Sequence, residues 1–203
     1  MVVYILITGA GSSSRMRGTD KLVQMVDGEP LLRRQAARAL AASPLVGVTL
    51  SASHPARMLA LAGLDVEACV LADASEGMAA SLRHAARRAP AYAGDWTATA
   101  IMVVPADMPD LTTADMQTII VAHAAAPTAI LRGTAADGTA GHPVLFPRDT
   151  WPELLLLRGD QGARAVLARL ADRVIAVALP DSNATTDLDT PEDWANWRAN
   201  RTG

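Results

Sequence analysis

Short apolar runs alternate along this chain with segments that have the 3.6-residue period of a helix. Strands are expected at Val2–Ile7, Val46–Leu50, Val66–Leu71, Ala100–Val104, Thr128–Leu131, Pro143–Phe146 and Val174–Leu179. Helices are expected at Pro30–Ala42, Pro55–Ala62, Met78–Ala89, Thr112–Ala125, Asp149–Leu157, Gly162–Ala171 and Pro191–Asn200. This alternation is typical of βαβ units, in which helices cover both faces of a parallel sheet. The sequence therefore predicts a three-layer α/β/α protein with a Rossmann-like, mostly parallel sheet.

Length and composition limit the remaining choices. The chain has 203 residues, of which 50% are apolar and 3% aromatic. That is enough for one α/β domain with an aliphatic core, and we expect a single domain over residues 1–203. The net charge is −3, so there is no basic excess that could follow a phosphate backbone. A general nucleic-acid binder is therefore excluded.

The cysteine content and the lengths of the apolar runs indicate the cellular compartment. The one cysteine, Cys69, lies in an apolar run, where we expect a buried thiol on a strand. It cannot form an internal disulfide, which favours a reducing environment. No apolar stretch is long enough to span a bilayer, and no secretory signal is visible. We therefore expect a cytoplasmic protein without a membrane partner.

A glycine- and serine-rich loop follows the first expected strand and runs from Thr8 to Lys21. In sheets of this kind, ligands bind at the carboxyl ends of the strands. Glycine and serine allow backbone N–H groups to close around an anion. Arg15 and Lys21 add the two cations that a triphosphate requires. The loop favours a phosphate site, although basic residues are also common on ordinary surface loops.

Two other phosphate-binding motifs fit this loop less well. A P-loop needs Gly-Lys-Ser/Thr at the start of a helix, and that is absent. A dinucleotide fingerprint needs a third glycine where Ser14 stands. It also needs an acidic residue at the end of the second strand, where Leu50-Ser51-Ala52 stands. The run Thr8–Gly11 keeps an NAD(P)-dependent oxidoreductase on a Rossmann-type sheet as an alternative.

The loop resembles the Ala-Ala-Gly-x-Ser-x-Arg-Met-Gly signature of nucleotidyltransferases. The matching positions are Gly11, Ser13, Arg15, Met16 and Lys21. Five later segments resemble the molybdenum-cofactor cytidylyltransferases, a family of MobA-like NTP transferases. They are Glu76–Arg83, Asp107–Pro109, Gly141–Phe146, Gly159–Arg164 and Asp187–Asp193, and they occur in the family's order. The chain departs from the family at Gly9, Arg17 and Ala106, where the family has Ala, Gly and Gly.

The resemblance implies that the protein moves CMP from CTP to molybdopterin, with Mg²⁺ as cofactor and release of pyrophosphate. It also implies a molybdenum hydroxylase as recipient of the product. In this family, Ala-Gly at the place of Ala10-Gly11 goes with CTP, and Gly-Gly goes with GTP. A non-catalytic chaperone of the molybdenum cofactor is a further alternative. The retention of Asp107, Asp189 and Lys21 argues against it.

Nucleotidyl transfer requires an aligned acceptor phosphate and neutralisation of the charge that builds up. The resemblance implies catalytic roles for Arg15, Lys21 and Asp107. It implies nucleotide binding by the first loop and by the start of the helix after the third strand. The residues are Thr8, Gly9, Ala10, Gly11, Ser12, Ser13, Lys21, Glu76 and Ser81.

The resemblance assigns Mg²⁺ binding to Asp107 and Asp189, and carboxylate oxygens are ligands that this ion prefers. Asp187 and Asp193 compete with Asp189 for the role. Asp107 has the alternative role of a turn or helix-cap residue.

The histidines show no ligand spacing, and without a Cys/His cluster no zinc site is expected. His142 is a candidate for the acceptor pocket, although a lone histidine is more often structural. His54, His84 and His123 are expected on helix or loop surfaces.

Overall fold

The computed structural model describes residues 2–91, 97–159 and 162–201. In this part of the chain, seven strands form one sheet in the order β5-β4-β1-β6-β8-β7-β9, and β2 and β3 form a hairpin. The strands are Val2–Gly9 (β1), Met25–Val26 (β2), Glu29–Pro30 (β3), Leu45–Leu50 (β4), Glu67–Val70 (β5), Ala98–Pro105 (β6), Ile130–Thr134 (β7), Ala140–Pro147 (β8) and Val174–Ala178 (β9). The helices are Leu31–Ala42 (α1), Pro55–Ala60 (α2), Met78–Arg88 (α3), Thr113–Ala125 (α4), Trp151–Leu155 (α5), Arg164–Arg169 (α6) and Pro191–Arg201 (α7).

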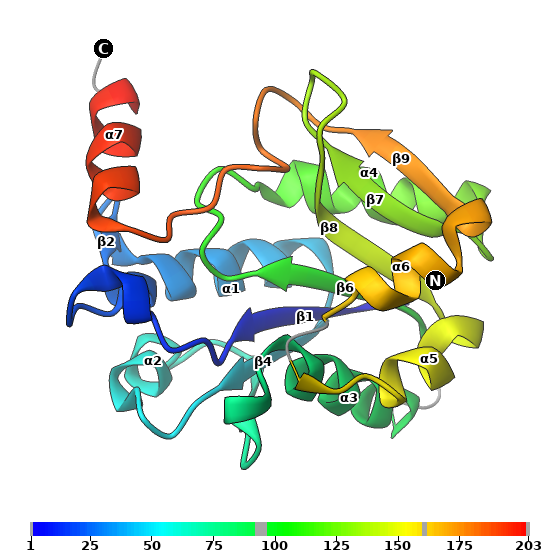
Figure 1. The fold of residues 1–203 in the computed structure, drawn as a ribbon, viewed down its shortest axis with the longest axis horizontal. Helices are drawn as coiled ribbons and strands as arrows, with labels where there is room; N and C mark the ends of the chain where they lie inside the picture. Colours follow the sequence, from blue (N-terminus) through cyan, green and yellow to red (C-terminus); the bar gives the residue numbers. More distant parts are fainter. Residues whose placement is uncertain (1, 92–96, 160–161, 202–203) are drawn as a thin grey trace.

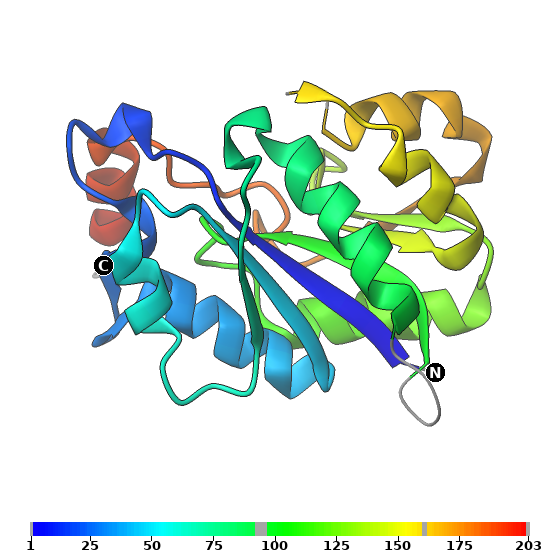
Figure 2. The same ribbon diagram turned by 90° about the horizontal axis from the view of Figure 1, so that it is seen from below.

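Helices cover both faces of the large sheet, which confirms the predicted three-layer α/β/α fold. Helices α1 and α4 lie on one face, and α3, α5 and α6 lie on the other (Figures 1 and 2). Helix α7 stands beside the β2–β3 hairpin, away from the main layers (Figure 1). None of the helices described here is both long and apolar enough to cross a membrane.

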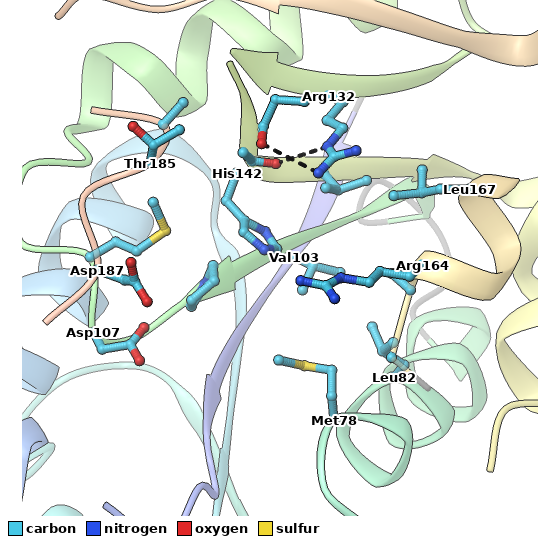
Figure 3. Close-up of a pocket in the computed structure, with 18 residues that line it drawn as sticks. Met78, Leu82, Val103, Asp107, Arg132, His142, Arg164, Leu167, Thr185 and Asp187 are labelled. Carbon is cyan, nitrogen blue, oxygen red and sulfur yellow. Dashed lines mark hydrogen bonds between the residues drawn. The ribbon is translucent and has the colours of Figure 1, made fainter. Parts of the chain in front are cut away.

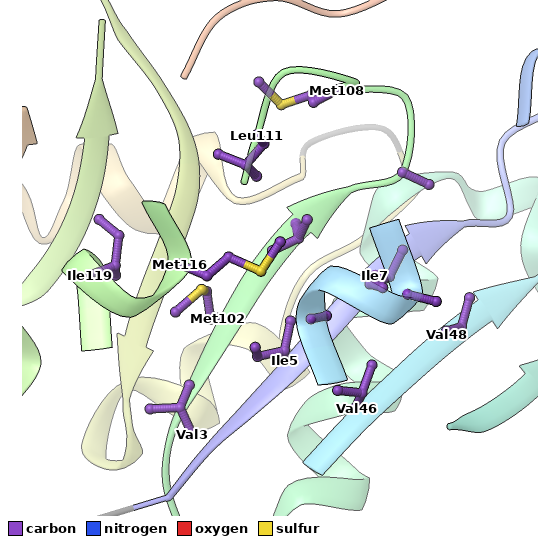
Figure 4. Close-up of a cluster of buried hydrophobic side chains, with 14 of the residues drawn as sticks. Val3, Ile5, Ile7, Val46, Val48, Met102, Met108, Leu111, Met116 and Ile119 are labelled. Carbon is purple, nitrogen blue, oxygen red and sulfur yellow. The ribbon is translucent and has the colours of Figure 1, made fainter. Parts of the chain in front are cut away.

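Strand β1 lies inside the sheet, and this position explains why its sequence is continuously apolar. Val3, Ile5 and Ile7 belong to the core beneath α1 and α4 (Figure 4). Tyr4 and Leu6 belong to the core beneath α3 and α5. Because successive side chains of a strand point to opposite faces, a strand covered by helices on both faces is apolar at every position.

The direction of one strand places additional residues at the ligand-binding edge. Strand β8 runs antiparallel to both of its neighbours, β6 and β7, whereas the other adjacent pairs are parallel. The prediction of a mostly parallel sheet is confirmed. Because β8 is reversed, its amino end lies at the edge where β1 and β6 end. Gly141 and His142 therefore reach the same edge as the glycine-rich loop.

The β2–β3 hairpin is absent from the predicted elements. Its turn is Asp27-Gly28, and both residues have positive φ, 49° and 87°. An Asp-Gly pair in this conformation is typical of tight hairpins, so the dipeptide was a usable signal. The predicted helix at Gly162 begins later, at Arg164, because Gly162 has a left-handed φ of 53°.

Two predictions about side-chain burial need correction. His123 is 1% exposed, with Nε2 3.4 Å from Thr99 Oγ1, so its predicted surface position is wrong. It lies on the side of α4 that faces the sheet, and burial lowers its pKa. Cys69 lies on β5 as expected but is only partly buried, because β5 is an edge strand. At the start of α4, Thr112 and Asp115 form a capping box, in which each side chain accepts a hydrogen bond from the backbone N–H of the other.

Candidate active site

The ammonium group of Lys21, the only lysine of the chain, lies between two carboxylates. Lys21 Nζ is 2.6 Å from Asp189 Oδ1 and also donates to Asp107 Oδ2. Arg15 Nη2 is 2.6 Å from Asp189 Oδ2. The structure therefore brings together four of the residues selected from the sequence, from three separate segments.

Local structure explains how these segments meet. Asp107 follows β6, and its carbonyl accepts a hydrogen bond of 3.0 Å from the N–H of Leu188, next to Asp189. Asp20 caps the short 3-10 turn η2 (Lys21–Val23) by accepting from the N–H of Leu22 at 3.1 Å. The carboxylate of Asp193 accepts from the N–H groups of Asp189 and Thr190, at 3.2 and 2.8 Å. Asp193 is thus engaged at the start of α7.

The electrostatics of the site follow from this crowding of charges. Burial opposes the charged form of Lys21, yet Asp107 and Asp189 keep its pKa above the ordinary value. Burial also opposes ionisation of Asp189, but Lys21 and Arg15 hold its pKa below the usual range. Burial and the neighbouring carboxylates of Asp189 and Asp107 raise the pKa of Asp187. One lysine and one exposed arginine thus face three carboxyl groups.

The donor set of this cluster fits a hard divalent cation. Mg²⁺ prefers carboxylate oxygens, and it usually keeps phosphate and water oxygens as its other ligands. Within the described residues, no group of three or more His, Cys, Asp or Glu forms a metal-binding cluster. A metal at Asp107 and Asp189 would therefore need ligands from a bound phosphate. Burial and, after it, the carboxylates of Asp189 and Asp107 raise the pKa of Asp187, and a cation bound between these carboxylates would relieve their repulsion.

Two adjoining cavities meet at Asp107. The smaller, of about 150 Å³, is lined by Thr8, Ala10, Gly11, Lys21 and Ser81, among others. The larger, of about 580 Å³, is lined by Arg132, His142, Arg164 and Asp187, among others. Met78, Pro105 and Asp107 line both cavities. This arrangement can hold two ligands side by side, with the charged cluster between them.

The other predicted nucleotide-binding residues differ in their surroundings. Gly11 and Ser12 are exposed, and Gly9 is buried at the end of β1. Ser81 is buried and accepts a hydrogen bond of 2.8 Å from Thr49 Oγ1. The carboxylate of Glu76 lies 3.0 Å from the guanidinium of Arg83.

His142 lies inside the larger cavity. Figure 3 shows its ring between the carboxylates of Asp107 and Asp187 at one end and the guanidinium of Arg164 at the other. Burial, with the positive charges of Arg132 and Arg164, lowers the pKa of His142 to about 4. Its Nδ1 is buried and has no hydrogen-bond partner within the described residues. A neutral imidazole in this position can exchange a hydrogen bond with a ligand.

Three arginines near the site were missed by sequence reasoning. Arg132 directly follows Leu131, so the rule about strand ends was sufficient to find it. Arg164 lies in a segment that carried the family resemblance; Asp160 and Gln161 of that segment are outside the described residues. Arg57 contacts the glycine-rich loop from α2, 37 residues beyond Asp20, and no spacing rule indicates it.

Arg17, one of the departures from the family pattern, is held by an ion pair. Arg17, where the family has glycine, adopts a left-handed φ of 52° that glycine would adopt without strain. Its guanidinium is 2.7 Å from the carboxylate of Glu192 on α7. The Arg17 guanidinium therefore pairs with Glu192 and not with Asp107 or Asp189, the carboxylates that hold Lys21. Within the described residues, Ala106 is not among those with positive φ, so an alanine is accommodated there.

A glycine-rich loop after the first strand, two cations and paired carboxylates at the carboxyl edge of the sheet define the class of this protein: an α/β nucleotidyltransferase. A family model for the MobA-like NTP transferase domain matches residues 5–174, and the chain belongs to this family. The resemblance seen in the sequence is confirmed at that level. Because the family consists of transferases, the alternative of an oxidoreductase is not supported.

Solved structures support the same fold. Rv0371c from Mycobacterium tuberculosis H37Rv is 28% identical, with a TM-score of 0.81 and 97% of both chains covered. Its manganese complex is 26% identical, with a TM-score of 0.78 and the same coverage. A nucleotidyl transferase from Methanothermobacter is 19% identical, with a TM-score of 0.77, 100% of this chain covered and 99% of the other. No curated protein matches the sequence.

Proposed function

We propose that this nucleotidyltransferase moves CMP from CTP to molybdopterin, with Mg²⁺ as cofactor and release of pyrophosphate. The observation that carries the proposal is the Lys21 ammonium held between Asp107 and Asp189 where the two cavities adjoin. Charge neutralisation is needed at that junction, because the reacting phosphates of two substrates must meet there.

The smaller cavity and the adjoining loop are the proposed CTP site. A cavity of about 150 Å³ is below the range of sites that enclose a whole ligand, so it encloses only part of a nucleotide. A single-ring pyrimidine near Ser81 suits this space better than a purine. The exposed backbone of Gly11 and Ser12, with Arg15 and Lys21, would receive the triphosphate. Ala10-Gly11, the form associated with CTP, supports the same choice.

The larger cavity is the proposed molybdopterin site. Its volume of about 580 Å³ is in the range typical of small-molecule sites. Met78, Leu82 and Leu167 offer apolar surface for a flat heterocycle, and Arg132 and Arg164 offer positive charge for an anionic group. Within the described residues, neither arginine forms an ion pair. A molybdenum hydroxylase is the proposed recipient of the product.

In the proposed reaction, a phosphate oxygen of the acceptor forms a bond to the α-phosphorus of CTP. The bond from the α-phosphorus to the oxygen that bridges it to the β-phosphorus breaks, and that oxygen leaves with pyrophosphate. Mg²⁺, held by Asp107 and Asp189, would neutralise negative charge on the phosphates. Lys21 would move from the carboxylates to the triphosphate, and Arg15 would hold its outer oxygens.

The substrate assignment is tested by incubating the protein with Mg²⁺, molybdopterin and each of the four NTPs, and by following pyrophosphate release. We expect release with CTP that depends on molybdopterin, and much less with GTP. Equal rates with all four nucleotides would contradict CTP specificity, and release without molybdopterin would contradict the acceptor.

The metal assignment is tested with Asp107→Asn, which keeps the shape but is a poorer Mg²⁺ ligand. We expect this variant to lose transfer and to remain folded, and we expect Asp189→Asn to have a weaker effect in the same direction. Asp149→Asn is the control, because Asp149 pairs with the distant Arg173 at 2.7 Å. Full activity of Asp107→Asn would remove Asp107 from the metal site.

A further inference from the structure

The side chain of Arg57 on α2 is fully buried, and among the described residues its guanidinium donates hydrogen bonds only to the glycine-rich loop. Its Nη1 donates to the carbonyls of Gly9 and Gly11, at 2.7 and 2.6 Å. Its Nη2 donates to Ser13 Oγ at 2.9 Å and to Asp20 Oδ1 at 2.8 Å, and its Nε donates to Asp20 Oδ2 at 2.8 Å. One side chain thus contacts the loop at four places between its start and its end.

These contacts orient the backbone of the loop. In a trans peptide, the carbonyl and the N–H of the next residue point in opposite directions. Because Arg57 draws the carbonyls of Gly9 and Gly11 toward α2, the N–H groups of Ala10 and Ser12 point away from it. Of these two groups, the N–H of Ser12 donates to no protein group within the described residues, and the N–H of Gly11, which lies between them, is likewise without a protein acceptor there. Backbone N–H groups that have no protein acceptor are suited to bind an anion.

The same contacts fix the segments that carry Arg15 and Lys21. Ser13, in a left-handed conformation with φ 52°, precedes the short 3-10 turn η1 (Ser14–Met16), which contains Arg15. Asp20 directly precedes Lys21 and caps η2. Arg57 joins Ser13 and Asp20, so it sets the separation between the segments that carry Arg15 and Lys21. Its positive charge is balanced by Asp20, and not by Asp107 or Asp189, the carboxylates that pair with Lys21 and Arg15.

We propose that Arg57 is the positioning residue of the triphosphate site: it holds the loop in the conformation that binds the phosphates without touching them. The inference rests on the proposed function and adds a residue that no sequence motif indicates. Loss of this geometry should weaken triphosphate binding and transfer together, since a displacement of about 1 Å can cost on the order of a hundredfold in rate.

Arg57→Lys tests the geometry, because it keeps the charge beside Asp20 but cannot reach all of the loop partners with one ammonium group. We expect binding of tripolyphosphate and of Mg·CTP, measured by calorimetry, to weaken about tenfold. We expect kcat/KM for CTP to fall between about tenfold and a hundredfold. KM for the acceptor should not change, because Arg57 does not line the larger cavity.

Arg57→Met removes the charge and leaves the carboxylate of Asp20 without its partner, so the single variant can fail to fold. It is therefore combined with Asp20→Asn, and in this double variant no unpaired carboxylate remains. Arg33→Met is the matched control. Arg33 donates to the carbonyls of Ala60 and Ala62, at 3.2 and 2.8 Å, so its loss loosens the end of α2 without touching the loop. We expect the double variant to bind tripolyphosphate weakly, and Arg33→Met to bind it like the unmodified protein.

Folded Arg57→Lys with unchanged tripolyphosphate affinity and kcat/KM would overturn the inference. A loss of tripolyphosphate affinity in Arg33→Met equal to that in the Arg57 variants would also overturn the inference. Failure of every Arg57 variant to fold would overturn it as well, because either result would mean that Arg57 contributes only to stability. If the unmodified protein binds tripolyphosphate but transfers no CMP, the proposed function is contradicted. The tripolyphosphate affinities of the variants would still test the role of Arg57. Absence of tripolyphosphate binding in the unmodified protein would contradict both.

Discussion

Lys21 occupies the position where charges from three chain segments meet. Its side chain is 13% exposed and contacts two carboxylates, whereas Arg15, on the same loop, is 67% exposed. This difference in exposure suggests different roles for the two cations. A buried cation next to the reacting phosphates stabilises charge that develops during transfer, and an exposed one mainly holds the substrate.

We therefore expect Lys21→Ala to lower kcat about a hundredfold, or roughly 3 kcal/mol of barrier, with a smaller effect on CTP affinity. Arg15→Ala should also weaken CTP binding. Steady-state kinetics and calorimetry with Mg·CTP measure the two effects. Arg17→Ala is the control, since Arg17 pairs with Glu192. Normal turnover with weaker binding in both variants would show that the residues only anchor the nucleotide.

His142 makes the stability of the protein dependent on pH. Its pKa is lowered to about 4, below the ordinary value of 6.5, so the unfolded chain binds the proton more tightly. The neutral form therefore contributes stability above pH 6.5, which is lost as the pH falls toward 4. We expect His142 to account for about 2 kcal/mol of stability lost between pH 7 and pH 5. Urea unfolding at pH 7 and pH 5 measures this loss of stability, and the His142→Gln variant should lose correspondingly less between the two pH values. An equal loss in the variant and the unmodified protein would contradict the lowered pKa of His142.

At the scale of elements, the reversed strand β8 connects the larger cavity to the segment that carries Asp187 and Asp189. The N–H of His142 donates to the carbonyl of Ala184 at 2.8 Å, and the same segment continues to Asp187 and Asp189. Strand β8 and the segment around Ala184 can approach this closely only because Gly141 has no side chain. A Cβ added at Gly141 would lie 1.8 Å from the Ala184 oxygen.

Gly141→Ala should therefore displace the segment that holds Asp187 and Asp189. We expect a loss of about 1–3 kcal/mol of stability, as for other overpacked sites, and a reduced kcat/KM. Gly138→Asn is the control in the turn that precedes β8, because a Cβ there meets nothing within 4 Å and asparagine is among the residues that most often adopt a positive φ, here 85°. Thermal unfolding and pyrophosphate release measure both effects. A Gly141→Ala protein with unchanged stability and rate would contradict this account of the close approach.

At the scale of the whole molecule, the sheet provides one edge where all the site segments converge. The loop after β1, Asp107 after β6 and the amino end of β8 come from neighbouring strands in the order β1-β6-β8. The helical layers bury both faces and leave this edge open. Ligands that bind here contact several segments at once, so they stabilise the folded state as a whole.

We expect Mg·CTP at a hundred times its Kd to stabilise the protein by about 2.7 kcal/mol. For a chain of this size, that corresponds to a rise in Tm of roughly 5–10 °C. Removal of the metal with EDTA should reduce the rise, because the triphosphate then faces Asp107 and Asp189 without a cation between them. GTP at the same concentration should give a smaller rise. A larger shift with GTP would contradict the proposed base preference.

The sequence by itself determined the class of fold, and it selected most of the polar residues of the candidate site. Periodic apolar runs predict strands and helices because burial on one or both faces is a local property of each segment. The first loop, Asp107 and Asp189 were recognisable because glycine conformations, strand ends and family motifs are also local. The prediction of one domain over residues 1–203 stays a prediction.

Only the tertiary structure decided which of these groups interact. In the sequence Asp187 and Asp193 compete with Asp189 for the metal-binding role, but a backbone hydrogen bond to Asp107 and the start of α7 give each of the three a different environment. The reversal of β8, the burial of His123 and the contact of Arg57 with the loop depend on pairings between distant segments. Spacing along the chain carries no information about such pairings, because they are selected by the packing of the whole core.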